Sequence, residues 1–184
     1  MATDTVVQVW CESRSLAGVL AGVCRDYRVN LYPAGGGCSI TFVNEGAGHV
    51  RDLKRSNAIA LYVGDYDQAG ECIDKAIHRE FETRLLKTGA DCSLDFRRLA
   101  VNEDQIDAMG LPTRAPKPTD KRSKHVTRVV EAEAIPAPTM RAIVREAIAE
   151  LIPADLLAAE RQEEESQRAE VRQRLNETFN GHTS

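Results

Sequence analysis

The chain has 184 residues, of which 42% are hydrophobic and 28% are charged, and its formal net charge is -4. This length suits one globular domain with a short extension, and the acidic balance excludes nucleic-acid binding through overall charge, so any such binding needs a local basic patch. No apolar run approaches the roughly 18 residues that span a membrane, and there is no signal-peptide pattern. The five scattered cysteines form no CxxC pair, so we expect a cytoplasmic protein without membrane contact.

The first third of the chain alternates between strand-like and helix-like segments. Residues 6–11 form a short apolar run that ends at Glu12, a pattern typical of a buried strand. Ser13 or Ser15 is placed to cap the next segment, where apolar residues recur every three or four positions as in an amphipathic helix. The segment 39–56 is ambiguous, and we favour a helix because a crossover must precede the next strand. We expect strands over 6–11, 29–32 and 59–63, and helices over 13–27 and 39–56.

The rest of the chain continues this alternation. Residues 129–135 resemble a strand, although Glu131 and Glu133 interrupt its apolar run. Beyond Pro153 the chain is charged and poor in large apolar residues, so we expect a solvated helix or a frayed extension. The remaining expected elements are a helix over 69–85, a strand over 94–101, a short helix starting near Asn102, and an amphipathic helix that runs from Met140 to Leu151.

Alternating strands and helices predict an α/β fold, a Rossmann-like parallel sheet with helices on both faces and a helical extension at the C-terminus. We expect one domain over residues 1–152 and a charged tail, helical or disordered, over 153–184. The segment 112–128 is a basic insertion in this domain, because it holds three prolines and six lysine or arginine residues but only one acid. We select Lys117, Lys121 and Arg122 as candidate phosphate contacts, and the alternative is a solvated loop.

Three acidic residues follow two of the expected strands. Glu12 ends the first strand, and Asp65 and Asp67 follow the third strand with a spacing that points both to the same side of an extended backbone. Parallel strands present their carboxyl ends at one edge of the sheet, where ligands bind, so the three carboxylates can converge there. Their mutual repulsion favours a cation, and oxygen ligands suit Mg²⁺ or Mn²⁺. The alternative is a solvated turn or a helix cap.

The stretches "VQVWCES" and "ALYVGDYDQAG" resemble the TOPRIM domain of topoisomerases, bacterial primases and OLD-type nucleases. The form GDxDxxG is most similar to the branch that contains the A subunit of topoisomerase VI, and "VEAEAIP" followed by an amphipathic helix is similar to small bacterial and phage relatives of that branch. The resemblance spans about Val6 to Leu151 and implies that Glu12, Asp65 and Asp67 are Mg²⁺ ligands.

The resemblance is incomplete at the N-terminus. In the topoisomerase VI relatives, the tyrosine that attacks DNA lies in a winged-helix domain before the TOPRIM domain, whereas only five residues precede the first expected strand here. We therefore do not expect strand passage by this chain alone.

Two hypotheses follow for the function. The first is a small Mg²⁺-dependent nuclease that nicks or cleaves nucleic acid, with DNA favoured over RNA. In it, Glu133 or Glu131 serves as general base or as ligand of a second ion. The second is a non-catalytic TOPRIM module that docks a separate chain bearing the DNA-binding or tyrosine domain, or that forms a homo-oligomer.

Overall fold

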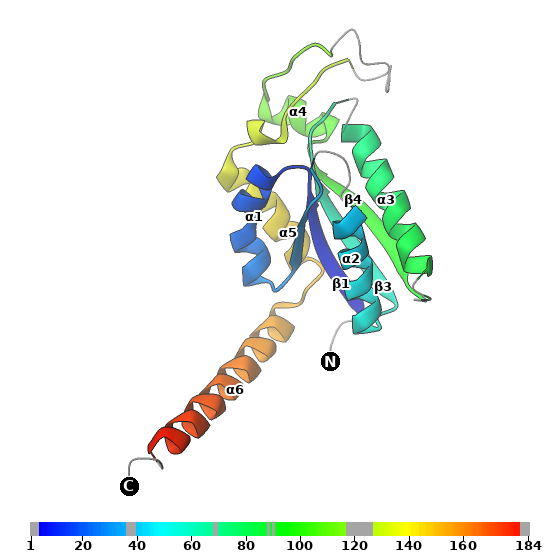
Figure 1. The fold of residues 1–184 in the computed structure, drawn as a ribbon. Helices are drawn as coiled ribbons and strands as arrows, with labels where there is room; N and C mark the ends of the chain where they lie inside the picture. The colour runs from blue at the N-terminus through cyan, green and yellow to red at the C-terminus, as the bar shows by residue number, and fades with distance from the viewer. Residues whose placement is uncertain are drawn as a thin grey trace.

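The computed structural model describes residues 4–35, 40–67, 70–87, 89, 91–116 and 127–180. Its centre is a four-stranded sheet in which every neighbouring pair of strands is parallel, in the order β2-β1-β3-β4 (Figure 1). This arrangement confirms the predicted α/β, Rossmann-like class. The strands are β1 (Thr5–Cys11), β2 (Asn30–Pro33), β3 (Asn57–Val63) and β4 (Ser93–Ala100).

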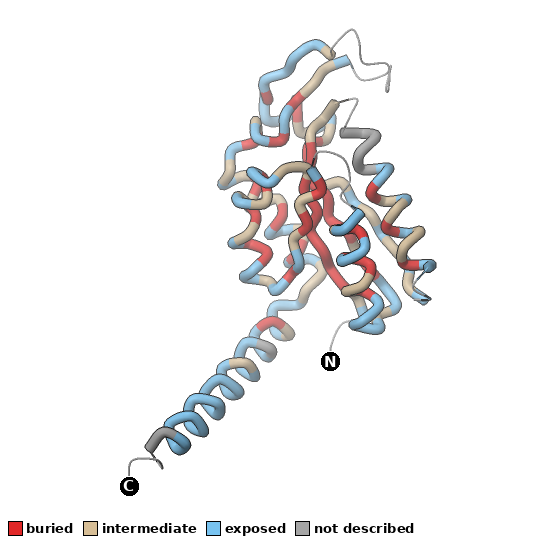
Figure 2. Tube along the Cα trace, viewed as in Figure 1, coloured by how far each residue is buried: buried red, intermediate tan, exposed pale blue. Residues whose placement is uncertain are grey.

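Helices cover both faces of the sheet, as predicted. One face packs against α1 (Arg14–Asp26) and α5 (Ala137–Ala149), and the other packs against α2 (Ile40–Leu53) and α3 (Gly70–Lys87). Because successive strand residues point to opposite faces, β1 serves both cores: Val7 and Val9 point to the first and Trp10 to the second. Figure 2 shows the buried residues concentrated in the strands and in the inner faces of these helices.

The second core is built around Trp10. Its ring stacks on Tyr32, with centroids 4.6 Å apart, and lies 5.3 Å from the ring of Phe81. Gln8, also fully buried, accepts a hydrogen bond from the Trp10 indole at 3.3 Å and donates one to the carbonyl of Gly46 at 3.0 Å. A Cβ atom at Gly46 would lie 2.7 Å from the Trp10 ring, so α2 packs this close to β1 only because residue 46 is glycine.

The helix expected over 39–56 is confirmed as α2, and Ser13 is the N-cap of α1. The strand expected over 129–135 is wrong. Val129 and Val130 form only isolated antiparallel bridges with Arg114 and Tyr66, and residues Ala132–Ala134 form a 3₁₀ helix, η1. The reason is that this segment meets loops instead of a strand, so it has no neighbour to pair with along its length.

Two further helices complete the described chain. The short α4 (Glu103–Met109) follows β4, and α6 (Ala154–Asn180) extends away from the sheet (Figure 1). The tail is thus helical in the structure, and most of its described residues are exposed. No helix among the described residues is long and apolar enough to cross a membrane.

Candidate functional site

The carboxyl ends of β1 and β3 lie side by side, and this places Glu12 next to the loop after β3. Cys11 pairs with Val63 in the sheet, and the backbone amide of Glu12 donates to the Val63 carbonyl at 2.9 Å. The backbone amide of Asp65 then donates to Oε2 of the Glu12 side chain at 2.8 Å. The structure therefore brings Glu12 and the Asp65 loop to one edge, as the sequence predicts.

The loop after β3 is also fastened to the segment before α5. Oδ1 of Asp65 accepts a hydrogen bond from the backbone amide of Ala132 at 2.9 Å. Tyr66 and Val130 exchange two backbone hydrogen bonds of 2.8 and 2.9 Å. The segment 130–132 thus lies directly against the loop that carries the two aspartates.

Glu133 lies at the same edge, although on η1 instead of the predicted strand. Its Oε1 accepts hydrogen bonds from the hydroxyls of Ser13 at 3.0 Å and Ser15 at 2.6 Å. The Ser13 hydroxyl also accepts a hydrogen bond from the amide of Leu16 at 3.1 Å, which caps α1. Because Ser13 follows Glu12 in the chain, these contacts close a ring of hydrogen bonds through three separate segments.

Arg98 supports this edge and was not anticipated from the sequence. Its Nη1 donates to the carbonyls of Gly64, Asp65 and Val101 at 3.1, 3.2 and 3.1 Å. Its guanidinium lies 5.2 Å from the centre of the Tyr62 ring. The one signal in the sequence is an arginine near the end of an otherwise strand-like run, and that signal does not say which loop the arginine contacts.

Burial and mutual repulsion raise the pKa values of two of the acids. For Glu12 burial is the main cause, Asp65 and Asp67 add to it, and the pKa rises to about 7 although the Asp65 amide and Arg98 act in the opposite direction. Burial likewise raises the pKa of Asp65 against the opposing hydrogen bond from Ala132, and neighbouring acids including Asp67 add to the increase. Burial therefore makes ionisation of Glu12 and Asp65 less favourable, and the neighbouring carboxylates add to this cost.

The pKa of Glu133 shifts in the opposite direction. Burial acts to raise its pKa, but the hydrogen bonds from the hydroxyls of Ser15 and Ser13, together with one from its own backbone, outweigh burial and lower the pKa. Glu133 therefore stays ionised more readily than Glu12.

The donor chemistry of this edge fits a divalent cation, since the nearby side chains offer carboxylate oxygens. Each of Glu12 and Asp65 uses one oxygen for a backbone amide, so a cation at this edge would meet the second oxygen of each carboxylate. Within the described ranges, no three Asp, Glu, His or Cys side chains converge closely enough to form a ready-made metal site. The roles of Glu12, Asp65, Asp67 and Glu133 therefore stay predictions.

The two ends of the basic segment lie beside the same loop. Arg114 bridges to Val129, whose neighbour Val130 pairs with Tyr66 between the two aspartates. Arg128 donates to both carboxylate oxygens of Asp107 at 2.5 and 3.0 Å. The two ends are thus anchored next to the edge that carries Glu12, Asp65 and Asp67, which we call the acidic edge, and the sequence does not reveal this proximity. The candidate phosphate contacts Lys117, Lys121 and Arg122 lie outside the described residues.

Comparisons of the chain with family models, with curated proteins and with solved structures gave no match. The fold class accordingly rests on the sheet topology, and the candidate site rests on the geometry given above. The TOPRIM resemblance stays an expectation from the residues that carry it.

Proposed function

We propose that the chain performs Mg²⁺-dependent phosphodiester chemistry on nucleic acid, as a small nuclease that nicks or cleaves DNA. The observation that supports this proposal is the gathering of partly buried carboxylates at the carboxyl edge of a parallel sheet, where Glu12 contacts the Asp65 loop directly. Such an edge is where α/β proteins bind ligands, and like charges there are relieved by a cation.

In this proposal Glu12, Asp65 and Asp67 hold the ion. Bound Mg²⁺ supplies Lewis-acid stabilisation of the charge that develops on a phosphate group. In the same proposal Glu133, beside the first turn of α1, is the general base that accepts a proton from a water molecule. Arg98 keeps the Gly64–Asp65 backbone in place through its contacts with the two carbonyls.

The second candidate is a non-catalytic module that binds a partner chain. One observation favours it: the carboxylates of Glu12 and Asp65 already bind backbone amides. In this interpretation the acidic side chains stabilise the loops of the candidate site through hydrogen bonds and take no part in catalysis.

Nicking of a supercoiled plasmid by the purified full chain tests the proposal. We expect open-circular product with Mg²⁺ and none with EDTA, and loss of the product in Asp65→Asn and Asp67→Asn. Glu146→Gln, an exposed acid on α5, is the matched control and should cleave as the unchanged chain does. DNA binding without cleavage in Mg²⁺ and in Mn²⁺ would favour the binding module instead, and a parallel assay on labelled RNA identifies the substrate.

A further inference from the structure

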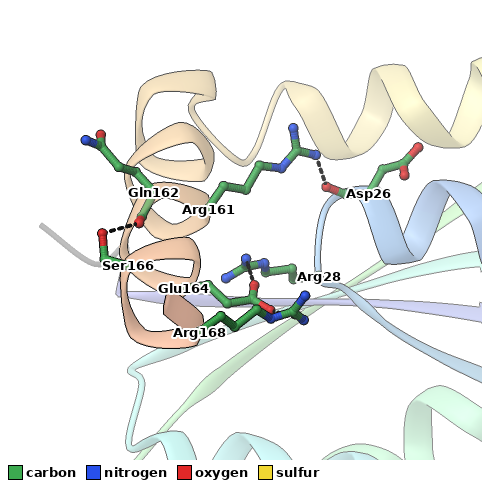
Figure 3. Close-up of polar contacts among 7 residues, drawn as sticks. All are labelled: Asp26, Arg28, Arg161, Gln162, Glu164, Ser166 and Arg168. Atoms are coloured by element: carbon green, nitrogen blue, oxygen red, sulfur yellow. Dashed lines mark hydrogen bonds and ion pairs between the residues drawn. The ribbon is translucent and has the colours of Figure 1, made fainter. Parts of the chain in front are cut away.

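A second charged feature lies at the opposite edge of the sheet, where the chain enters β2. The first turns of α6 lie close to the turn between α1 and β2. Leu157 of α6 is buried, and Nη2 of Arg161 donates to the backbone carbonyl of Asp26 at 2.6 Å (Figure 3). These contacts hold one side of α6 facing Arg28.

Four arginines surround the space between α6 and this turn. The space is a cleft of about 510 Å³ that we call the arginine cleft, and its arginines are Arg28, Arg161, Arg168 and Arg172. The three on α6 are spaced by seven and four residues, so they lie on one side of the helix. At a rise of about 1.5 Å per residue they extend over roughly 16 Å along the helix axis.

One carboxylate of the chain already binds inside the arginine cleft. Glu164 forms an ion pair with Arg28 through one oxygen, and its other oxygen lies 2.5 Å from Nη2 of Arg168 (Figure 3). A single anionic group is therefore seated between guanidinium groups from two separate elements. This shows that the geometry suits an oxyanion, since guanidinium groups bind carboxylate and phosphate oxygens in the same way.

The Glu164 carboxylate does not neutralise all the positive charge of the arginine cleft. Glu165 also lines the cleft, and Glu163 lines an adjoining cavity of about 210 Å³ with Arg28 and Glu164. Among the described residues that line the two cavities, four guanidinium groups thus face three carboxylates, a positive surplus within a chain whose net charge is -4. Among the described residues, no carboxylate pairs with Arg161 or Arg172, and the partner that Arg161 does have is a neutral carbonyl.

The ion pair of Glu164 is easily displaced. The side chains of Arg28 and Glu164 are 37% and 39% exposed, and exposed ion pairs add little net stability. Arg28 also has a positive φ of 55°, a conformation that glycine or asparagine adopts at lower cost. An arginine at this costly position points to a role for its side chain.

We propose that the arginine cleft binds a linear chain of phosphate groups, with Glu164 as an internal competitor. Guanidinium groups spread over roughly 16 Å match several successive phosphates better than a single small anion. The chemistry is shared by a free oligophosphate and by the sugar–phosphate backbone of nucleic acid. The site goes beyond the proposed function, because it lies at the opposite edge of the sheet from Glu12 and requires no metal ion.

Binding of two probes to the full chain in EDTA tests this proposal. The probes are tripolyphosphate, followed by calorimetry, and a short fluorescent single-stranded oligonucleotide, followed by anisotropy. We expect binding of at least one probe, and the one that binds more tightly identifies the source of the phosphate chain. Because metal is absent, the result is independent of whether the acidic edge is a nuclease site.

Variants connect the binding to the cleft. Glu164→Gln should tighten binding about twofold to fivefold, the factor expected when one exposed ion pair no longer competes. Arg168→Ala with Arg172→Ala should weaken binding and flatten the slope of log K against log salt by about 0.7 per lost contact on the oligonucleotide. Arg28→Asn suits the left-handed backbone and should weaken binding without loss of folding.

Arg174→Ala is the matched control, because Arg174 lies on the same helix but pairs with Glu170 and does not line the cleft. Its affinity should equal that of the unchanged chain. Failure of both probes to bind would overturn the proposal. Equal weakening by Arg174→Ala and by the cleft variants, or weaker binding in Glu164→Gln, would also overturn it, since the arginines would then only attach α6 to the domain.

Discussion

Replacement of Glu12 by glutamine should make the stability of the domain less dependent on pH. Burial raises the folded-state pKa of Glu12 from 4.5 to about 7. An acid whose pKa is raised by folding contributes stability that is fully present below the unfolded pKa and is lost as pH rises through the folded pKa. The unchanged chain should therefore lose stability between about pH 4.5 and pH 7.

The size of this effect follows from the shift. At about 1.36 kcal/mol per pKa unit the full shift corresponds to roughly 3 kcal/mol, and solvent screening at this half-buried site reduces it to about 1–2 kcal/mol. For a chain of this length that is a change in melting temperature of about 2–8 °C. Glutamine resembles the protonated form and keeps an oxygen to accept the Asp65 amide, so Glu12→Gln should avoid the loss.

The assay is thermal unfolding in metal-free buffer at several values between about pH 4 and pH 8. We expect the melting temperature of Glu12→Gln to exceed that of the unchanged chain near pH 8 and to match it at about pH 4, below the unfolded pKa. Glu146→Gln, on the exposed side of α5, should follow the unchanged chain at every pH. A Glu12→Gln variant that is less stable than the unchanged chain near pH 8 would contradict this expectation, because it would mean that the ionised carboxylate stabilises the fold.

Three other substitutions test separate parts of the structure. Asp65→Asn keeps an oxygen that accepts the Ala132 amide, so its free energy of unfolding should stay within about 1 kcal/mol of that of the unchanged chain. Asp65→Ala should lose about 1–3 kcal/mol. Equal losses in the two variants, measured by chemical denaturation, would contradict this role of Asp65. Gly46→Ala should destabilise the domain by about 1–3 kcal/mol, because its Cβ would meet the Trp10 ring, and an unchanged denaturation midpoint would show that α2 can shift. Joint replacement of Lys117, Lys121 and Arg122 by alanine should weaken DNA binding for all sequences alike. It should also flatten the slope of log K against log salt by about 0.7–0.9 per lost contact. An unchanged slope would indicate that the segment is a solvated loop.

Local patterns were sufficient to predict most of the fold. The valine-rich run of β1 indicates a strand buried on both faces of a sheet, and the hydrophobic periodicity of α1 indicates a helix buried on one face. Both patterns can be seen from residues that are close in the sequence. The prediction failed at residues 129–135, where an apolar run interrupted by Glu131 and Glu133 also resembles a strand but pairing depends on distant partners. The amide of Ala132 binds Asp65, which is 67 residues away in the chain.

The acidic residues of the candidate site could be predicted from the sequence, but the residues that hydrogen-bond to them and to their loops could not. Glu12 and Asp65 could be placed together because strand ends of a parallel sheet share an edge. The contacts of Ser15 with Glu133 and of Arg98 with the Gly64 carbonyl join residues 118 and 34 positions apart. Such contacts follow from tertiary packing, and no spacing within the sequence encodes them.

Calorimetric titration of the metal-free chain with Mn²⁺ tests directly whether the acidic edge binds a divalent cation, as we propose. We expect saturable binding that weakens at least tenfold in Asp65→Asn and in Glu12→Gln, one tenfold change being about 1.4 kcal/mol, with no change in Glu146→Gln. Saturable binding that is identical in all four proteins, or no binding in the unchanged chain, would contradict it.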